Sequence, residues 1–544
     1  YAVQALPVVG NPSTDDAVAW ATAYYANRLA GVLVEANPAI SRVFESWKKS
    51  GKDQETLMSN LEKNSDLKDL LLAETPWVAE AADEAEQKRR IALLFDLNGM
   101  SSRLQQAADK LRTLQLTDGS WSWYKGMKGS RYITTQTVEL MARLKAMNIS
   151  LTDGMEAQYG RALGYLRKEV KKVYEQMRIQ ERENNIQVRP DEQIVKYLYI
   201  CALDETARKQ ADKEINTYFL ARLTNRSAEC SIYEKSLLAV IMHAYGQKRQ
   251  AELLLQSVKE YMLATPEMGR YFDTSKAGYS WNSYKIPTQV AAMEAIWRIA
   301  PDQHLLGDMK QWLLKQKQVQ VWDSPLATAD AVYAFLGMGG NRLQASGSLK
   351  ARIGSKTLVT PDDALGYVRQ TYTGADTEVS RIAVVKSGEG LSWGAVYAQY
   401  LEDMIRVRPF RTNGLGIVRE YWLGDEQVSA STRLKPGDKL IVRLTVKADR
   451  DMDFVQIKDE RASCMEPAVQ LSGYHWNGGI GYYQVNKDAS TEFFIDQMRK
   501  GAYVLEYTVY LDRPGTYQAG IATIQSAYAP EFNGHTDGVE LTIE

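Results

Sequence analysis

Three cysteines are the most reactive side chains of this 544-residue sequence, and their placement argues against disulfide and metal chemistry. Cys201, Cys230 and Cys464 are too few for a disulfide framework, and no two stand at the short spacing of metal ligands. Cys201 and Cys230 lie in apolar segments with helical period, where a cysteine behaves as a small hydrophobic side chain. We therefore expect buried thiols.

Histidines and neighbouring acids are the other candidates for chemistry, and neither group forms a catalytic pattern. The four histidines are scattered, with no ligand-like spacing: His243, His304, His475 and His535. Adjacent acids occur at Asp15-Asp16, Asp83-Glu84 and Asp362-Asp363. Such neighbours are typical of caps, turns and solvated helix faces, whereas glycoside hydrolysis needs carboxylates that face each other across a cleft. We predict no catalytic residue, no metal site and no cofactor.

A turn that carries a tryptophan and runs into a threonine-containing helix start occurs three times. The turns are 117–126, 278–284 and 321–325, and they lead into helical patterns at 134–140, 287–293 and 327–333. Turn residues end one helix, the tryptophan fills the gap between hairpins, and a Thr or Ser hydroxyl caps the next helix. Recurrence of this unit indicates stacked or ring-closed helical hairpins.

The aromatic side chains of these turns are also candidate binding residues: Trp121, Trp123, Tyr124, Trp281, Tyr284 and Trp322. Aromatics at the same end of every hairpin would line the concavity that a ring encloses. Packing is the stronger interpretation, because tryptophan is a large apolar body with one N–H to satisfy. We predict that the three Trp turns lie at one end of a closed ring.

Length and charge narrow the classes of function. A chain of 544 residues is too long for one core and should form several domains. With a formal net charge of -1 and interspersed charges, it has no basic footprint for nucleic acid and no polybasic membrane patch. Its apolar runs are far shorter than the ~18 residues of a membrane span. Since no signal pattern begins at Tyr1, we expect a part of a longer polypeptide, with any signal or lipid anchor upstream.

Residues 1–340 have helical period in nearly every segment and no clear strand signal, which predicts an all-α domain. Helices are expected from Ala17 to Ala30 and at about 39–50, 53–75, 79–115, 133–148, 155–185, 190–204, 206–223, 231–245, 248–264, 287–299, 302–316 and 327–337. No strict heptad is sustained, so an α/α toroid is favoured over a coiled coil.

The period changes after residue 340, and two β regions follow. Residues 341–406 contain short strand patterns at 348–359, 381–386 and 393–400, too few for a sandwich. We expect this partial β module to complete a domain whose other strands precede Tyr1. Residues 407–544 look self-contained, with strands at 416–422, 439–446, 453–458, 481–485, 491–495, 503–510, 515–520 and 539–543. About eight strands at this spacing predict an antiparallel β-sandwich.

This order, an α/α toroid followed by a partial β module and a β-sandwich, resembles the C-terminal end of α2-macroglobulin-like proteins. Tyr24–Ala30 is similar to the helix after the thioester turn in bacterial members. The loop 118–124 running into 133–135 resembles the family's Gly-rich aromatic loop and Thr-containing helix. Segments similar to the closing macroglobulin domain are 434–438, 455–459, 513–517 and 526–531.

One departure from the family matters more than the match. Thioester members carry Cys-x-Glu-Gln at the start of this domain, and the Cys thiol and Gln side chain form a bond that acylates a trapped protease. Counting back from Tyr24, this motif falls at Asp16-Ala17-Val18-Ala19, and no cysteine precedes Cys201. The chain therefore resembles the thioester-free bacterial branch, and we predict no thioester.

The resemblance implies a non-enzymatic segment that works by protease trapping or protein interaction in the periplasm or cell envelope. It implies proteases or other proteins as partners, membrane attachment only through an upstream lipid anchor, and an oxidising setting in which a Cys201–Cys230 disulfide is the alternative to free thiols. Two other functions stay open. A carbohydrate-active lyase or glycosidase shares the toroid and sandwich layout by analogy of fold alone, and a structural envelope scaffold is the third reading.

Overall fold

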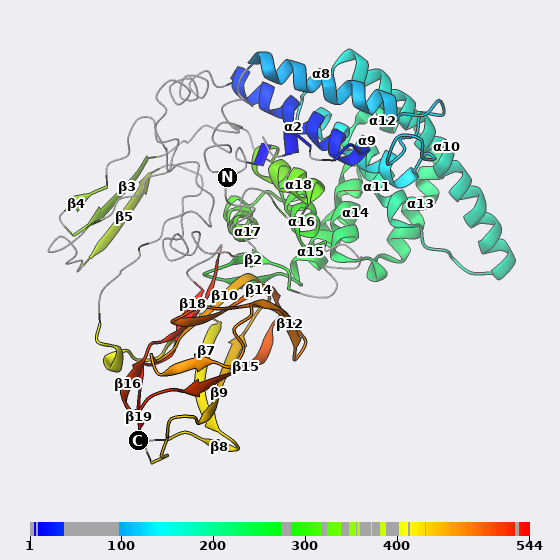
Figure 1. Cartoon of the computed structure of the whole chain (residues 1–544). Coiled ribbons are helices and arrows are strands. Elements are labelled where there is room, and N and C mark those ends of the chain that lie inside the picture. Colours follow the sequence, from blue (N-terminus) through cyan, green and yellow to red (C-terminus); the bar gives the residue numbers. More distant parts are fainter. Residues whose placement is uncertain are drawn as a thin grey trace. The chain divides into compact units, whose positions relative to one another are not determined.

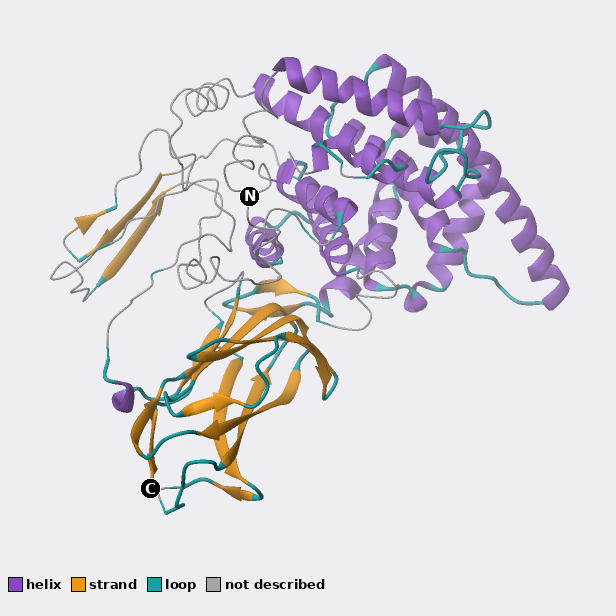
Figure 2. Cartoon of the chain, viewed as in Figure 1, coloured by secondary structure: helices purple, strands orange, loops and turns teal. Residues whose placement is uncertain are grey.

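A computed structural model of the chain describes most of its helical part and most of its C-terminal part. The described residues are 5–6, 9–12, 14–36, 97–273, 284–316, 322, 324–338, 348–354, 356–358, 372, 381–387, 396, 402–411, 414–429, 431–527 and 532–544. They fall into two compact units, one holding the described residues up to Ser387 and the other those from Val396 onward (Figure 1). Figure 2 shows the long helices in the first unit and most of the strands in the second, and the predicted helical region followed by β domains is confirmed. The exact domain boundaries at 340 and 406 stay a prediction.

Some helices of the first unit are buried on nearly all sides, and others are buried on one face only. Their bounds are α2 (Ala17–Ala36), α8 (Leu97–Leu114), α9 (Arg131–Ala146), α10 (Asp153–Asn184), α11 (Glu192–Leu203), α12 (Glu205–Gln210), α13 (Lys213–Asn225), α14 (Ile232–Ala244), α15 (Lys248–Lys259), α16 (Lys285–Ile299), α17 (Gln303–Lys315) and α18 (Pro325–Leu336). Helix α14 buries every residue from Ile232 to Met242. Helix α15 buries a single stripe, Ala251, Leu254, Leu255 and Val258, as an amphipathic covering helix does.

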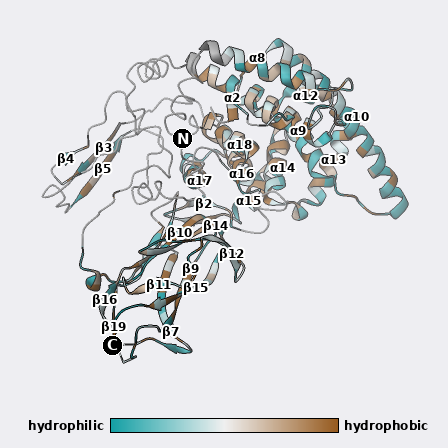
Figure 3. Ribbon diagram, viewed as in Figure 1, coloured by the Kyte–Doolittle hydropathy of each residue, from teal (hydrophilic) through white to brown (hydrophobic). Residues whose placement is uncertain are grey.

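Six of the described helices close into a cycle, which we call the central ring: α2, α9, α11, α14, α16 and α18. Each packs on the next in this order, and α18 packs back on α2. Helices α8, α10, α15 and α17 lie against members of the ring. Figure 3 colours α16 and α18 largely hydrophobic and α10 largely hydrophilic, as an inner and an outer layer require. None of the helices in the described part of the chain is long and apolar enough to cross a membrane.

Two expectations for the helical part were wrong. The helix predicted at 206–223 is broken at Ala211, because the Asp212 carboxylate accepts from the backbone N–H groups of Glu214 and Ile215 and starts α13 anew. The helix predicted to reach 264 ends at Lys259, and a hairpin of β1 (Leu263–Thr265) and β2 (Gly269–Tyr271) follows. Gly269 has a φ of 75° and lies so close to α17 that a Cβ would come within 2.2 Å of the Asp308 carbonyl oxygen. A glycine turn and this close approach explain why strands occur there.

A small antiparallel sheet in the order β4-β3-β5 follows the helices. It comprises β3 (Ser348–Ile353), β4 (Lys356–Thr357) and β5 (Ile382–Ser387), which overlap the patterns predicted at 348–359 and 381–386. The strand predicted at 393–400 lies outside the described residues except for Val396. Neighbouring side chains Val384 and Val385 point to opposite faces and are both exposed. Both faces of this sheet therefore lack a full apolar cover.

The second unit is an antiparallel sandwich. One sheet has the order β12 (Gly473–Asn477), β13 (Ile480–Asn486), β14 (Ser490–Met498), β10 (Met452–Glu460), β17 (Ala522–Ser526), β18 (Asn533–His535), β6 (Phe410–Arg411). The other has the order β11 (Met465–Pro467), β15 (Gly501–Leu511), β9 (Lys439–Ala448), β7 (Leu415–Leu423), β8 (Glu426–Gln427), and β16 (Gly515–Ala519) pairs with β19 (Val539–Ile543). All eight predicted strands are present.

The core of the sandwich follows from alternation in the sequence. Strand β9 buries Leu440, Val442, Leu444 and Val446 and leaves the residues between them less buried. One buried ion pair links the two sheets: the Arg419 guanidinium on β7 lies 2.7 Å from the Asp459 carboxylate on β10. The Tyr507 hydroxyl on β15 donates to the same carboxylate at 2.7 Å, and Arg419 also donates to the carbonyls of Glu460 and Gly520. A buried pair with this many partners fixes the alignment of the sheets.

Candidate functional site

The loop before α9 is built around a buried tryptophan. The Trp121 indole N–H donates to the Leu111 carbonyl oxygen near the end of α8 at 2.9 Å, and its backbone N–H donates to the Thr134 hydroxyl at 2.9 Å. The Thr134 hydroxyl in turn donates to the Ser130 carbonyl at 2.7 Å. Gly119 has a φ of 91° and touches the Arg161 carbonyl so closely that a Cβ would not fit. The loop therefore fastens α8, α9 and α10 to one another.

The loop before α18 makes the same bonds with different residues. The Trp322 indole N–H donates to the Leu313 carbonyl in α17 at 2.7 Å, and its backbone N–H donates to the Thr328 hydroxyl at 3.1 Å. The Thr328 hydroxyl also lies 2.8 Å from the Ser324 carbonyl that it donates to. The recurrence seen in the sequence thus corresponds to a repeated joint, in which a tryptophan ties an outer helix to the next helix of the central ring.

The other predicted binding aromatics lie in three different situations. Trp281 falls outside the described residues. Tyr284 directly precedes α16, and its hydroxyl donates to Glu192 at 2.9 Å while its ring packs edge-on against Tyr233. Trp123 and Tyr124 are exposed and nearly parallel, with ring centroids 6.5 Å apart and planes 6° apart. Of the predicted set, only this last pair presents its rings to solvent within the described residues.

The segment Asp16-Ala17-Val18-Ala19 forms the start of α2. The Asp16 carboxylate accepts from the Ala19 backbone N–H at 3.0 Å and from the Thr14 hydroxyl at 2.6 Å. The backbone N–H of Ala17 donates to the Trp123 carbonyl at 3.0 Å. A carboxylate here satisfies the free N–H groups of the first turn and suits the positive end of the helix. The start of α2 and the exposed aromatic pair are therefore parts of one site.

The three thiols of the chain are distant in sequence from the start of α2, and they are unreactive. Cys201, Cys230 and Cys464 are free and buried, as expected, and no disulfide joins the first two. Burial raises the pKa of Cys201 to about 12 and also raises the pKa values of Cys230 and Cys464. A thiol with a raised pKa is a poor nucleophile at neutral pH.

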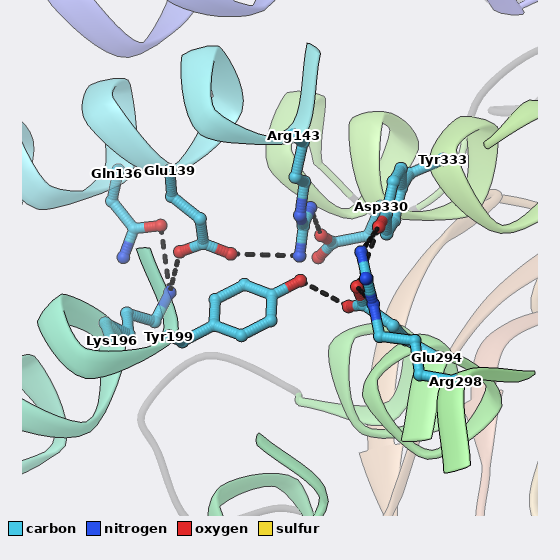
Figure 4. A network of polar contacts seen from close by, with 9 residues as sticks. All are labelled: Gln136, Glu139, Arg143, Lys196, Tyr199, Glu294, Arg298, Asp330 and Tyr333. Atoms are coloured by element: carbon cyan, nitrogen blue, oxygen red, sulfur yellow. Dashed lines mark hydrogen bonds and ion pairs between the residues drawn. The ribbon is translucent and has the colours of Figure 1, made fainter. Parts of the chain in front are cut away.

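The interior of the central ring contains a set of polar residues that sequence reasoning missed. Figure 4 shows this central charge network, which consists of Gln136, Glu139, Arg143, Lys196, Tyr199, Glu294, Arg298, Asp330 and Tyr333. They come from α9, α11, α16 and α18, and eight of them are buried. The signal in the sequence was the presence of single charges inside apolar helices, such as Lys196 between Val195 and Tyr197.

One half of the network joins α9 to its neighbours. The Lys196 ammonium donates to Glu139 at 3.1 Å and to Gln136 at 3.0 Å. The Arg143 guanidinium lies 2.9 Å from Glu139 and pairs with Asp330. Arg143 and Asp330 link α9 to α18, the two helices that flank α2 in the central ring.

The other half joins α11, α16 and α18 through one carboxylate. The hydroxyls of Tyr199 and Tyr333 both donate to Glu294, the latter at 2.7 Å, and Arg298 donates to it at 2.6 Å. Arg143 lies over the Tyr333 ring at 5.0 Å from its centroid and connects the two halves. Three acids and three bases thus meet in the interior with each charge paired.

The ion pairs of the central charge network shift the pKa values of its members. Burial alone would raise the pKa of Glu139, but Lys196 and Arg143 outweigh it and lower this pKa. Burial would likewise lower the pKa of Lys196, and Glu139 raises it instead. Burial raises the pKa of Asp330, which Arg143 only partly offsets. All six charged side chains are already engaged with one another, so the arrangement suits holding the ring together better than acid–base catalysis.

Comparison with known proteins points to one family. Residues 414–531 match the Bacterial Alpha-2-macroglobulin MG10 domain. An alpha-2-macroglobulin homolog of Nostoc sp. (strain PCC 7120 / SAG 25.82 / UTEX 2576) is 22% identical over 484 residues, which cover 80% of this chain and 23% of that protein. This chain is bacterial alpha-2-macroglobulin-like. The resemblance read from the order of its segments is confirmed.

Two further matches differ in how much of this chain they cover. Circularly permutated Ras protein 2 of Dictyostelium discoideum is 25% identical over 172 residues, 30% of this chain and 4% of that protein. The solved structure of trypsin-activated alpha-2-macroglobulin from Escherichia coli covers 83% of this chain and 30% of its own, with 13% identity and a TM-score of 0.40. The alpha-2-macroglobulin-like chain therefore spans about a quarter or less of the curated relatives it matches.

Proposed function

We propose that this alpha-2-macroglobulin-like chain is a non-enzymatic part of a protein that traps proteases, or engages other proteins, without forming a covalent thioester. The observation that carries the proposal is the start of α2. Where thioester members place their reacting Cys and Gln, this chain has Asp16-Ala17-Val18-Ala19, and Asp16 serves as a helix cap. Proteases are the partners we expect, and the periplasm or cell envelope is the proposed location.

Capture without a covalent bond must rest on shape and surface contact. The exposed Trp123 and Tyr124 rings lie beside the start of α2, and the Ala17 N–H to Trp123 carbonyl bond holds them there. Aromatic side chains contribute large contact areas at low entropic cost. We assign this pair to partner contact, and the buried Trp121 and Trp322 to packing.

A methylamine experiment tests the absence of the thioester. Amine treatment of the native full-length protein should leave its mass unchanged and release no thiol, because the start of α2 has neither the Cys nor the Gln that would form a thioester carbonyl for the amine to attack. A thioester-bearing family member is the positive control. Incorporation of methylamine together with a new titratable thiol would overturn the proposal. If neither reaction occurs and large-substrate proteolysis also stays uninhibited, the scaffold function takes its place.

A further inference from the structure

Strand β12 forms one margin of the seven-stranded sheet (Figure 1). It pairs with β13 from Gly473↔Gln484 to Asn477↔Ile480, and no strand among the described residues pairs with its other edge. Gly478 and Gly479, with φ values of 58° and 83°, form the tight turn between the two strands. The N–H and C=O groups along the free edge are therefore open to pairing with another chain.

This edge lacks the side chains that usually protect an edge strand. Soluble proteins place Lys, Pro or a bulge at such edges, whereas β12 reads Gly-Tyr-His-Trp-Asn. Its Tyr474 and Trp476 side chains are 64% and 73% exposed, and Leu471 in the preceding loop is 83% exposed. Residues 467–486 contain no Asp, Glu, Lys or Arg, in a sequence with 24% charged residues. The result is a neutral, aromatic and aliphatic surface.

The aromatic side chains of the edge are held in place by the neighbouring strand. Trp476 stands opposite Gly481, and a Cβ at Gly481 would lie 2.9 Å from the Trp476 ring and 2.5 Å from the Tyr474 hydroxyl. Both rings therefore lean over the glycine of β13. On the opposite face His475 stacks on Tyr482, which is buried against Phe493. The hairpin is thus anchored to the core while its edge stays exposed, which reduces the ordering cost of binding.

We infer that the free edge of β12 binds an extended, uncharged polypeptide segment as an added strand. Main-chain pairing would supply affinity, and Tyr474, Trp476 and Leu471 would contact alternate aliphatic side chains of that segment. A sugar chain fits less well, because the exposed side chains flanking the rings include Leu471 and Val469 rather than charged hydrogen-bonding groups. A second copy of this chain also fits less well. A five-residue edge is about 17 Å long. Pairing along this edge alone would bury less surface than the roughly 1,200 Å² that stable interfaces bury.

The test uses the full chain and a fluorescein-labelled, end-capped peptide of alternating valine and threonine that is long enough to cover β12. A matched peptide with methylated backbone nitrogens keeps the side chains and loses the main-chain donors. Trp476→Lys and Leu471→Lys place a charge on the surface, and Leu471 has no packing role to lose. Val418→Lys adds the same charge at an exposed strand position on β7 and serves as the control.

Fluorescence anisotropy should show binding of the unmethylated peptide to the wild-type chain and to Val418→Lys. Each of the other two variants should weaken binding about tenfold or more, and the methylated peptide should not bind. Equal binding by Leu471→Lys, or equal binding of the methylated peptide, would overturn the proposal. So would absence of peptide binding together with binding of a neutral oligosaccharide such as cellohexaose, which would assign the edge to sugars.

Discussion

At the residue scale, the central charge network decides how the interior of the ring responds to substitution. Arg143 is buried, lies between Glu139 and Asp330, and has no alternative partner in water. Removal of one member of a buried ion pair leaves an uncompensated charge in a medium of low dielectric constant. The network therefore contributes more to the uniqueness of the ring than to its net stability.

Arg143→Met should lower the free energy of unfolding of the helical unit by roughly 3 to 5 kcal/mol. Arg112→Met is the matched control, since Arg112 forms an exposed pair with Asp109 on α8, and its loss should cost at most about 1 kcal/mol. Urea unfolding followed by circular dichroism at the helical signal measures both. Equal effects of the two substitutions would show that the interior tolerates unpaired charge.

A second residue-scale prediction concerns acid. Hydrogen bonds from Arg222, at 2.9 and 2.8 Å, hold the pKa of Glu181 at about 2. A carboxyl whose pKa is lower in the folded state stabilises that state above its unfolded pKa and loses this contribution as pH falls through the folded value. Between pH 4.5 and 2, Glu181→Gln should therefore lose less stability than the wild type. Thermal unfolding at several pH values measures this. If the melting temperatures of the two proteins fall by the same amount between pH 4.5 and 2, the assignment is contradicted.

At the element scale, the repeated joint fixes two of the contacts between outer helices and the central ring, α8 with α9 and α17 with α18. Trp121 and Trp322 each tie an outer helix to a helix of the central ring through two bonds of the same kind. Local chemistry was enough to predict this joint, because the turn, the tryptophan and the threonine are close in sequence.

Substitution at the two joints should therefore have equal effects. Trp121→Phe removes the indole N–H that donates to the Leu111 carbonyl, and Trp322→Phe removes the one that donates to the Leu313 carbonyl. Each should cost about 1 to 3 kcal/mol of stability. Trp123→Phe changes an exposed ring and should have almost no effect. Thermal unfolding of the three variants checks this, and a Trp123→Phe variant that is destabilised as much as the other two would contradict the assignment of packing to Trp121 and Trp322 and of surface contact to Trp123.

Other features could not be predicted from the sequence. Some depend on side chains that are far apart in sequence, and others are strands too short to show a periodic pattern. Glu139 and Lys196 are 57 residues apart, and Tyr199 and Glu294 are 95 apart, so no local pattern pairs them. Strand β12 was missed because Gly473–Asn477 is short, begins with a glycine and is followed directly by Gly478 and Gly479. The β1–β2 hairpin was missed because three-residue strands carry almost no periodic signal.

At the scale of the whole molecule, the helical unit and the sandwich each have a core of their own. Units of this kind can change relative position as rigid bodies without unfolding. Under the proposed trapping function, cleavage of the full-length parent by a protease that it captures should alter its small-angle scattering profile and leave the thermal unfolding of the sandwich unchanged. An unaltered profile, with the protease fully active on large substrates, would reject trapping.

The closure of the central ring by α18 on α2 has a consequence for synthesis on the ribosome. Asp330 follows its partner Arg143 by 187 residues, which takes about 10 to 40 s to translate at typical bacterial and eukaryotic rates. Until then α2 and α9 lack their last neighbour, and Arg143 has only Glu139 to neutralise it. A nascent chain therefore waits with an open ring and a half-formed interior, which makes it a client for chaperones that cover apolar helices. A stop codon before α18 would make that waiting state permanent.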